Sequence, residues 1–237
     1  MLKILAVIPA RGGSKRLPRK NIKLLGGKPL INWSIDSAKE ISEICSIVVS
    51  TDDEEIATIA KKAGATVPWL RPAELSSDDS KSADVAIHAL NWYQSNYGNV
   101  DGLLLLQPTS PFRTTSTIKT GIKIFREKSF NPVLGVKPCN EQPIWILRKD
   151  REILEPLLDY VFLFKSSSKG VKEIYEPSGN FYLISPADLI SSKSLVNKFA
   201  YPLIPGKDIE NIDIDTHNDF ERAEAIISGR SEYKTIN

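Results

Sequence analysis

The sequence predicts one α/β domain built on a mainly parallel, twisted sheet with helices on both faces. Apolar runs of strand length, at 3–8, 46–51 and 101–106, alternate with segments whose apolar residues recur at helical spacing. The chain of 237 residues is long enough to bury one complete core, and its 41% hydrophobic and 25% charged residues are ordinary for a globular protein. Successive strand, helix and strand segments favour right-handed connections within one sheet.

The first strand is expected at 3–8, because this apolar run leads into a loop at Pro9, as a buried parallel strand does at its carboxyl end. A helix begins at Leu30, where the apolar spacing becomes helical. The second strand is expected at 46–51, and the helix after it has acids in its first turn and ends at Gly64. A weaker third strand follows at 65–70.

A polar loop at 76–84 precedes a helix with an apolar face, and the strand at 101–106 is the clearest buried strand of the chain. The proline-rich segment 107–113 is expected to be a loop. A helix from Thr117 to about Lys128 and a strand at 132–136 complete the regular alternation.

The alternation ends after Val136. Residues 137–178 contain several prolines and two apolar runs, and this excursion packs either on a partner subunit or over the protein's own core. Strands are expected again at 179–184 and, as a short alternating run, at 212–216. A closing helix is expected at 218–227, followed by a loose tail.

Composition excludes several classes of function. The 31 Lys and Arg are nearly balanced by 29 Asp and Glu, so no broad basic surface for nucleic acid is expected. The apolar start is too short for a signal sequence or a membrane span. Two cysteines and two histidines are too few for a disulfide framework or a histidine-rich metal site, and we expect a protein of the reducing cytoplasm.

The segment 8–21, called the basic loop below, joins two adjacent glycines, Gly12 and Gly13, to a hydroxyl at Ser14 and several cations. Glycines let a ligand approach the backbone, and lysine and arginine bind anions with several oxygens, so the loop suits a polyphosphate. Its spacing matches neither the P-loop nor the dinucleotide fingerprint. Taken alone, such a loop is more often a solvated basic turn.

Asp213 and Asp215 stand two residues apart, so in an extended segment both side chains point to the same face. Paired carboxylates bind a hard divalent cation that also binds phosphate oxygens. A bare Asp-x-Asp is more often a solvated strand face. Together with the basic loop, however, the pair predicts a site for a metal-bound nucleoside triphosphate.

Two further loops are candidates for the same edge of the sheet. Segment 107–113 carries an amide and hydroxyls that suit a polyhydroxylated ligand, although it is equally a rigid turn. Arg71 and Ser82 follow the third strand, where a guanidinium and a hydroxyl can reach a base; as isolated residues they would be surface features.

These segments, read together, closely resemble the acylneuraminate cytidylyltransferases, the CMP-sialic acid synthetases. The matching motifs are 8–15 with Lys20 and Asn21, then 70–75, 105–111 and 212–216, in the same order over nearly the whole chain. The resemblance implies a nucleotidyltransferase-like fold in a single domain, 1–237, with a dimerisation excursion at about 137–178 and a homodimer.

The resemblance also implies the roles of individual residues. CTP would be bound by Ala10, Arg11, Gly13, Ser14, Lys15, Asn21, Arg71 and Ser82. An acidic nine-carbon sugar would be bound by Gln107, Thr109, Ser110, Asn180, Phe181 and Tyr182. Asp213 and Asp215 would hold Mg²⁺. Arg11 and Lys20 would offset developing charge, and Asp213 or a metal-bound hydroxide would be the base.

The implied reaction transfers CMP from CTP to the anomeric hydroxyl of a sialic-acid-like nonulosonic acid and releases pyrophosphate. Many sialic acid synthetases have an arginine and Asn-Gly-Ala-Ile-Tyr where this chain has 176–182, so a legionaminic or pseudaminic acid is an alternative acceptor. An octulosonic acid is less favoured, since that family has Gln-Gly-Asp at 107–109. A non-catalytic nucleotide-sugar binding protein and an Asp-x-Asp glycosyltransferase are further alternatives.

Overall fold

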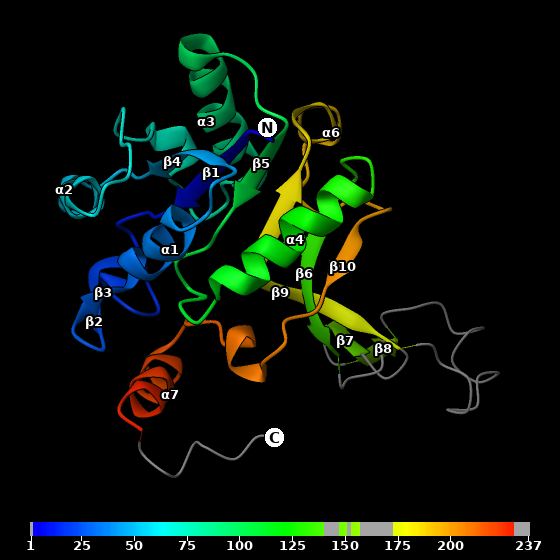
Figure 1. Cartoon of the computed structure of the whole chain (residues 1–237). Coiled ribbons are helices and arrows are strands. Elements are labelled where there is room, and N and C mark those ends of the chain that lie inside the picture. Colours follow the sequence, from blue (N-terminus) through cyan, green and yellow to red (C-terminus); the bar gives the residue numbers. More distant parts are fainter. Residues whose placement is uncertain (1, 140–146, 151–152, 157–172, 230–237) are drawn as a thin grey trace.

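The computed structural model describes residues 2–139, 147–150, 153–156 and 173–229 (Figure 1). Its central sheet has the order β10-β6-β9-β5-β1-β4. The strands are β1 (Ile4–Pro9), β4 (Ile44–Ser50), β5 (Gly102–Leu105), β6 (Val133–Pro138), β9 (Tyr175–Ile184) and β10 (Tyr201–Leu203). Strand β9 runs antiparallel to both of its neighbours, and the other pairings are parallel. The predicted mainly parallel sheet is confirmed.

Helices cover both faces of this sheet, as predicted. Ile4, Ala6 and Ile8 of β1 face one core, which is covered by α1 (Leu30–Lys39), α2 (Glu54–Lys62) and α4 (Thr115–Glu127). Leu5 and Val7 face the other core, which is covered by α3 (Ser82–Tyr97) and α6 (Pro186–Ser192). Every residue of β1 before Pro9 is buried because both faces are covered. None of the described helices is long and apolar enough to cross a bilayer.

A smaller unit packs beside the sheet edge near the basic loop (Figure 1). It consists of the hairpin β2 (Leu24–Leu25) with β3 (Lys28–Pro29) and of the closing helix α7 (His217–Ile227). Leu25, Ile214 and Phe220 form its apolar core. Helix α7 begins with a capping box between Thr216 and Asp219, which fixes where the chain after Asp215 turns into the helix.

The remaining short elements of the described ranges are three 3₁₀ turns and a strand pair. They are η1 (Lys20–Ile22), η2 (Ala73–Leu75), η4 (Asp208–Asn211), and β7 (Leu147–Asp150) paired antiparallel with β8 (Ile153–Pro156). Much of the predicted excursion at 137–178 lies outside the described residues, as does the predicted tail after Gly229. The role of the excursion in dimerisation stays a prediction.

Two predicted strands differ in the structure. The segment 65–70 forms only two isolated bridges, from Thr66 to Val48 of β4 and from Leu70 to Thr51, the residue after β4. The predicted strand at 212–216 is wrong: this segment is extended but has no sheet partner, because it crosses the end of the sheet on its way from η4 to α7. A backbone hydrogen bond from Ile214 N to Thr109 O (2.8 Å) joins it to the loop after β5.

Candidate functional site

The basic loop is fastened to the connection between β4 and α2. Gly12 N donates to the Asp52 carboxylate (2.8 Å), and Asn21 Nδ2 donates to Arg11 O within the loop (2.9 Å). A Cβ at Gly12 would lie 2.8 Å from Asp53 Oδ2, so the loop passes too close to α2 for a side chain at this position. The loop is therefore restrained by a contact to the β4–α2 connection and by a hydrogen bond of its own.

The cations of the loop divide into two groups. Arg19 has a left-handed backbone (φ 58°) and its guanidinium pairs with Asp53 and Glu55, so it anchors the loop to α2. Arg11, Lys15, Arg16 and Lys20 instead line a cavity. The backbone turn at Arg19 thus separates one structural cation from four that face a ligand site.

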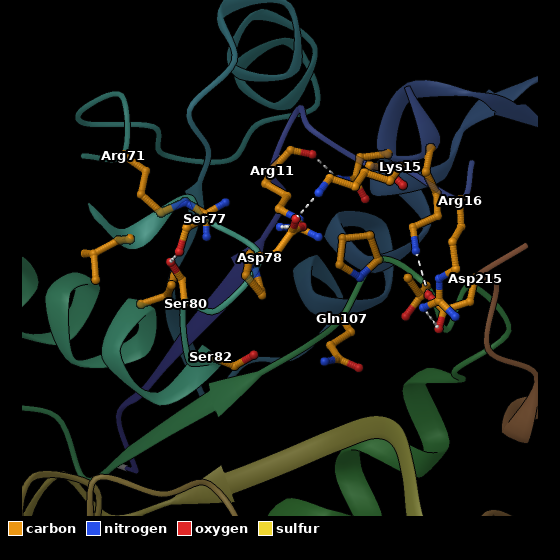
Figure 2. A pocket seen from close by; sticks show the side chains of 18 of the residues that line it. Arg11, Lys15, Arg16, Arg71, Ser77, Asp78, Ser80, Ser82, Gln107 and Asp215 are labelled. Atoms are coloured by element: carbon orange, nitrogen blue, oxygen red, sulfur yellow. Dashed lines mark hydrogen bonds and ion pairs between the residues drawn. The ribbon is translucent and has the colours of Figure 1, made fainter. Parts of the chain in front are cut away.

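This cavity lies where the chain leaves the carboxyl ends of β1 and β5, the edge at which open α/β sheets bind ligands (Figure 2). Its volume of about 500 Å³ suits a small molecule. The lining residues are Pro9, Arg11, Ser14, Lys15, Arg16, Lys20, Asn21, Arg71, Leu75, Ser77, Asp78, Ser80, Ser82, Val85, Gln107, Pro108, Thr109, Asp213 and Asp215. Two of the lining carboxylates, Asp213 and Asp215, are the pair predicted to bind a divalent cation.

Arg71 is buried in the cavity wall with 7% of its surface exposed. Its backbone N donates to Thr51 O (2.6 Å), which places the residue at the end of the isolated bridges beside β4. The guanidinium Nε and Nη2 have no hydrogen-bond partner among the described residues, and burial lowers the pKa of the group. Buried donors without partners favour a ligand with acceptor atoms at this position.

Asp213 and Asp215 face the same cavity, as their spacing predicts, while Ile214 between them is buried in the opposite direction. Asp215 accepts from Lys20 Nζ (2.9 Å) and Arg16 Nη2 (2.6 Å). Burial opposes ionisation of Asp215, but these two cations lower its pKa below the ordinary value. Burial, with the charge of Asp215, raises the pKa of Asp213, and the Oδ1 of Asp213 has no hydrogen-bond partner among the described residues.

This pair of carboxylates fits Mg²⁺. The ion is commonly bound in proteins by one or two carboxylates, with substrate phosphates and water completing its shell. The partnerless Oδ1 of Asp213 is a buried acceptor that a cation would satisfy. No larger group of metal-ligating side chains occurs within the described ranges, so a dedicated all-protein metal cage is absent there.

Gln107 connects the first cavity to a second one of about 300 Å³. The second cavity is lined by Lys81, Ser82, Ala83, Gln107, Tyr182, Lys193, Ser194, Leu195 and Val196. Ser82 and Gln107 line both cavities. The second cavity combines two ammonium groups, a phenol and an apolar wall, so it suits an acidic ligand with apolar substituents.

The structure brings most of the predicted site residues together. Those that line the first cavity are Arg11, Ser14, Lys15, Lys20, Asn21, Arg71, Ser82, Gln107, Thr109, Asp213 and Asp215, and Tyr182 lines the second. Ala10 and Ser110 are fully buried outside both cavities, and Gly13 is exposed beside the first.

Two predicted sugar-binding residues, Asn180 and Phe181, lie in the core of the structure. Asn180 is fully buried; its Oδ1 accepts from Ser178 Oγ (2.8 Å) and its amide donates to Glu210 O (3.3 Å). Phe181 is fully buried against Gly121 of α4. Because β9 lies inside the sheet between β5 and β6, these side chains belong to the core and not to a cavity wall.

Asp78 and Gly179 are among the residues of the site that sequence reasoning missed. Asp78, which follows η2, pairs with Arg11 (2.7 Å) and Lys15 (2.5 Å) (Figure 2). Gly179 has φ +80°, and a Cβ there would lie 2.9 Å from Gln107 Oε1. A glycine inside a predicted strand was the available signal for a close approach at 179. Nothing in the sequence indicated the partner of Asp78.

Comparisons with known proteins find similarity to cytidylyltransferases. A family model described as cytidylyltransferase matches residues 5–145. The chain is 38% identical to a CMP-N,N'-diacetyllegionaminic acid synthase of Legionella pneumophila, over 98% of this chain and 99% of that protein. It is 32% identical to an N-acylneuraminate cytidylyltransferase of Escherichia coli, over 98% of this chain and 54% of that protein. A pseudaminic acid cytidylyltransferase of Campylobacter jejuni is 31% identical, over 95% and 96%.

Solved structures show the same fold. A CMP:2-keto-3-deoxy-manno-octonic acid synthetase complexed with CTP superposes with a TM-score of 0.67 at 16% identity, over 96% of this chain and 99% of that one. A 4-diphosphocytidyl-2C-methyl-D-erythritol synthase from Anaerococcus prevotii superposes with a TM-score of 0.64 at 14% identity, over 96% of both chains. The nucleotidyltransferase-like fold and the family resemblance drawn from the sequence motifs are confirmed.

Proposed function

The chain belongs to the cytidylyltransferase family, and from this premise we propose that it transfers CMP from CTP to the anomeric hydroxyl of a nonulosonic acid, releasing pyrophosphate. The names of its relatives supply the acceptor class: legionaminic, neuraminic and pseudaminic acids. The observation that carries the proposal is one cavity in which phosphate-binding cations, a buried arginine with partnerless donors and a carboxylate pair face one another.

The nucleotide occupies the first cavity. Arg11, Ser14 and Lys15 would hold the triphosphate, because two cations and a hydroxyl on one loop supply donors for several phosphate oxygens. Lys20 and Asn21, at the start of η1, line the same cavity and would contact phosphate and ribose. Ala10 and Gly13 would contribute only backbone groups.

Arg71 and Ser82 are proposed to bind the cytosine base. The partnerless Nε and Nη2 of Arg71 are donors for the acceptor atoms of a pyrimidine edge, and the Ser82 hydroxyl lies in the same cavity. A base that lacks these acceptors would leave a buried guanidinium unpaired, which is the physical basis for selecting one nucleotide.

Asp213 and Asp215 would hold Mg²⁺ with the phosphate oxygens of the substrate. When bound, the ion supplies charge neutralisation at the phosphates and lowers the pKa of a nearby hydroxyl. Lys20 and Arg16 keep Asp215 ionised and fix its orientation. Arg11 and Lys20 offset the charge that develops on the phosphates during transfer.

The acceptor would lie across Gln107, partly in the second cavity. Its anomeric oxygen forms a bond to the α-phosphorus, the bond from that phosphorus to the bridging oxygen breaks, and pyrophosphate leaves. Asp213 is the candidate acceptor of the hydroxyl proton, through the carboxylate oxygen that does not hold the ion. Lys81 and Lys193 offer charge for a sugar carboxylate, and Leu195 offers an apolar surface for an acyl group.

The decisive experiment incubates the protein with CTP, Mg²⁺ and one acid at a time: a legionaminic, a neuraminic, a pseudaminic and an octulosonic acid. Pyrophosphate release together with a new CMP-sugar identifies the acceptor. Tight CTP binding with no turnover on any of them would favour a non-catalytic nucleotide-sugar binding protein. Thermal protection by a nucleotide-sugar but not by CTP would favour a glycosyltransferase.

We further propose that the protein acts as a homodimer in the cytoplasm. The proposal rests on the family resemblance and on the excursion at 137–178, most of which the structure does not describe. Light scattering of the purified protein tests it, and a monomeric mass at working concentration would contradict it.

A further inference from the structure

Asp78 forms ion pairs with two cations of the basic loop, Arg11 and Lys15. One carboxylate oxygen lies 2.7 Å from Arg11 Nη1 and the other lies 2.5 Å from Lys15 Nζ. Figure 2 shows the Asp78 side chain reaching toward Arg11, with Lys15 on the same side of the cavity. A single carboxylate thereby uses both of its oxygens on cations that a phosphate chain would use.

These contacts are strong enough to keep Asp78 ionised and weak enough to be displaced. Hydrogen bonds from Lys15 and Arg11 lower the pKa of the Asp78 carboxyl below its ordinary value. The side chains remain exposed to solvent, at 80% for Lys15 and 45% for Asp78. Ion pairs with this exposure contribute little to stability, so a ligand with more negative charge can replace the carboxylate.

The segment that carries Asp78 is ordered by its own hydrogen bonds. Ser77 Oγ contacts Ser80 Oγ (2.9 Å), Ser80 Oγ donates to Glu74 O (3.1 Å), and Ser76 Oγ donates to Pro72 O (3.0 Å). Within the described residues, the only hydrogen bonds and ion pairs that join this segment to the basic loop are those of Asp78. The side chain can therefore leave the cations without unfolding the segment.

We propose that Asp78 is an internal competitor for polyphosphate: it holds Arg11 and Lys15 when no nucleotide is bound, yields them to the phosphates of CTP, and returns as pyrophosphate leaves. The inference rests on the proposed role of Arg11 and Lys15 in binding the triphosphate. For any ligand that needs both cations, the apparent dissociation constant equals the intrinsic one divided by the fraction of molecules in which Asp78 does not hold them. Weakly bound single anions are thereby kept off the loop, and product release is faster.

The test measures binding of inorganic tripolyphosphate, CTP and cytidine by calorimetry, without an acceptor. Asp78→Asn should bind tripolyphosphate and CTP about 3- to 10-fold more tightly than wild type, because a carboxamide does not hold the two cations. Cytidine binding should not change, since it lacks phosphates. Asp78→Glu, which restores a carboxylate, should return tripolyphosphate binding toward wild type.

Asp79→Asn is the matched control. Asp79 is an exposed acid of the same segment, so its replacement makes the same change in net charge without freeing the two cations. Asp79→Asn should bind tripolyphosphate within about 2-fold of wild type, because exposed charges are screened. An equal gain in both variants, no gain in Asp78→Asn, or no tripolyphosphate binding by any variant would overturn the inference.

The tripolyphosphate measurement needs neither turnover nor a sugar. If the proposed CMP transfer is absent, the shift between wild type and Asp78→Asn still decides the role of Asp78. If transfer occurs without this shift, Asp78 is only a surface ion-pair partner of the loop. The two proposals therefore fail by different results.

Discussion

The Arg113 guanidinium donates a hydrogen bond to the backbone carbonyl of Gln107 over 3.0 Å, although Arg113 lines neither cavity. The same guanidinium donates to Ser34 Oγ (3.2 Å) and to the carbonyl of Asn180. Arg113 is 4% exposed, and burial lowers its pKa to about 9, partly offset by the charge of Glu210. One buried cation thus fixes the Gln107 loop against α1 and β9.

Replacing Arg113 is expected to destabilise the protein and to disturb the acceptor side of the site. Arg113→Met should lower the free energy of unfolding by about 2–4 kcal/mol, because it leaves buried acceptors without donors. The Michaelis constant for the sugar should rise more than that for CTP, since Gln107 is the residue displaced. Urea unfolding and steady-state kinetics measure the two effects.

Arg126→Met is the control for this change. Arg126 pairs with Glu43 (3.2 Å) on the surface, so its loss should lower the free energy of unfolding by about 1 kcal/mol or less. Equal effects of the two substitutions would show that the buried network around Arg113 does not position Gln107.

Asp215→Asn is expected to abolish most turnover while leaving the protein folded. The substitution removes a carboxylate proposed to hold Mg²⁺ and breaks the pairs with Lys20 and Arg16. A loss on the order of 10²- to 10³-fold in kcat is expected from the loss of one preorganised charge contact. Asp208→Asn, at an exposed acid of η4 outside both cavities, should retain wild-type turnover. Wild-type turnover in Asp215→Asn would remove Asp215 from the proposed metal site.

Gly179→Ala is expected to impair the site through a collision with Gln107. A Cβ there would lie 2.9 Å from Gln107 Oε1, and the left-handed backbone adds a conformational cost of about 1–2 kcal/mol. Gly98→Ala is the matched control, because Gly98 has φ +88° but open space around it. Both variants should lose stability in thermal melts, but only Gly179→Ala should show a higher Michaelis constant for the sugar. A rise in both variants would contradict a local collision.

The pH dependence of stability is expected to include a contribution from His88. Burial lowers the pKa of His88 in the folded state, and its ring packs against Trp69 with centroids 4.7 Å apart. The unfolded chain therefore binds more protons below the ordinary histidine pKa of about 6.5, so stability is full above that pH and falls as the pH falls below it.

His88→Gln should flatten this decline between about pH 7.5 and 5, as followed by the urea midpoint. His217→Gln is the control, since it removes an exposed histidine, 3.4 Å from Glu221; equal flattening in both variants would contradict a contribution from the burial of His88. A wild-type decline that persists in His88→Gln would assign it to other groups.

Much of the site was predictable from local sequence. The apolar run of β1 placed the basic loop at a carboxyl end, and the alternation of Asp213, Ile214 and Asp215 placed both carboxylates on one side even though no strand forms there. Both predictions depend on the pattern of apolar and polar residues within a short segment, and the sequence shows this pattern directly. The family motifs supplied the activity.

The tertiary structure alone decided which distant side chains meet. Asp215 meets Lys20 and Arg16, and Asp78 meets Arg11 and Lys15, because crossovers bring separate loops to one edge of the sheet. Insertion of β9 antiparallel between β5 and β6 turned Phe181 and its neighbour Asn180 into core residues. The residue pattern of a strand predicts which side chains share a face. It does not predict which strands lie beside it, because strand pairing depends on packing over the whole chain.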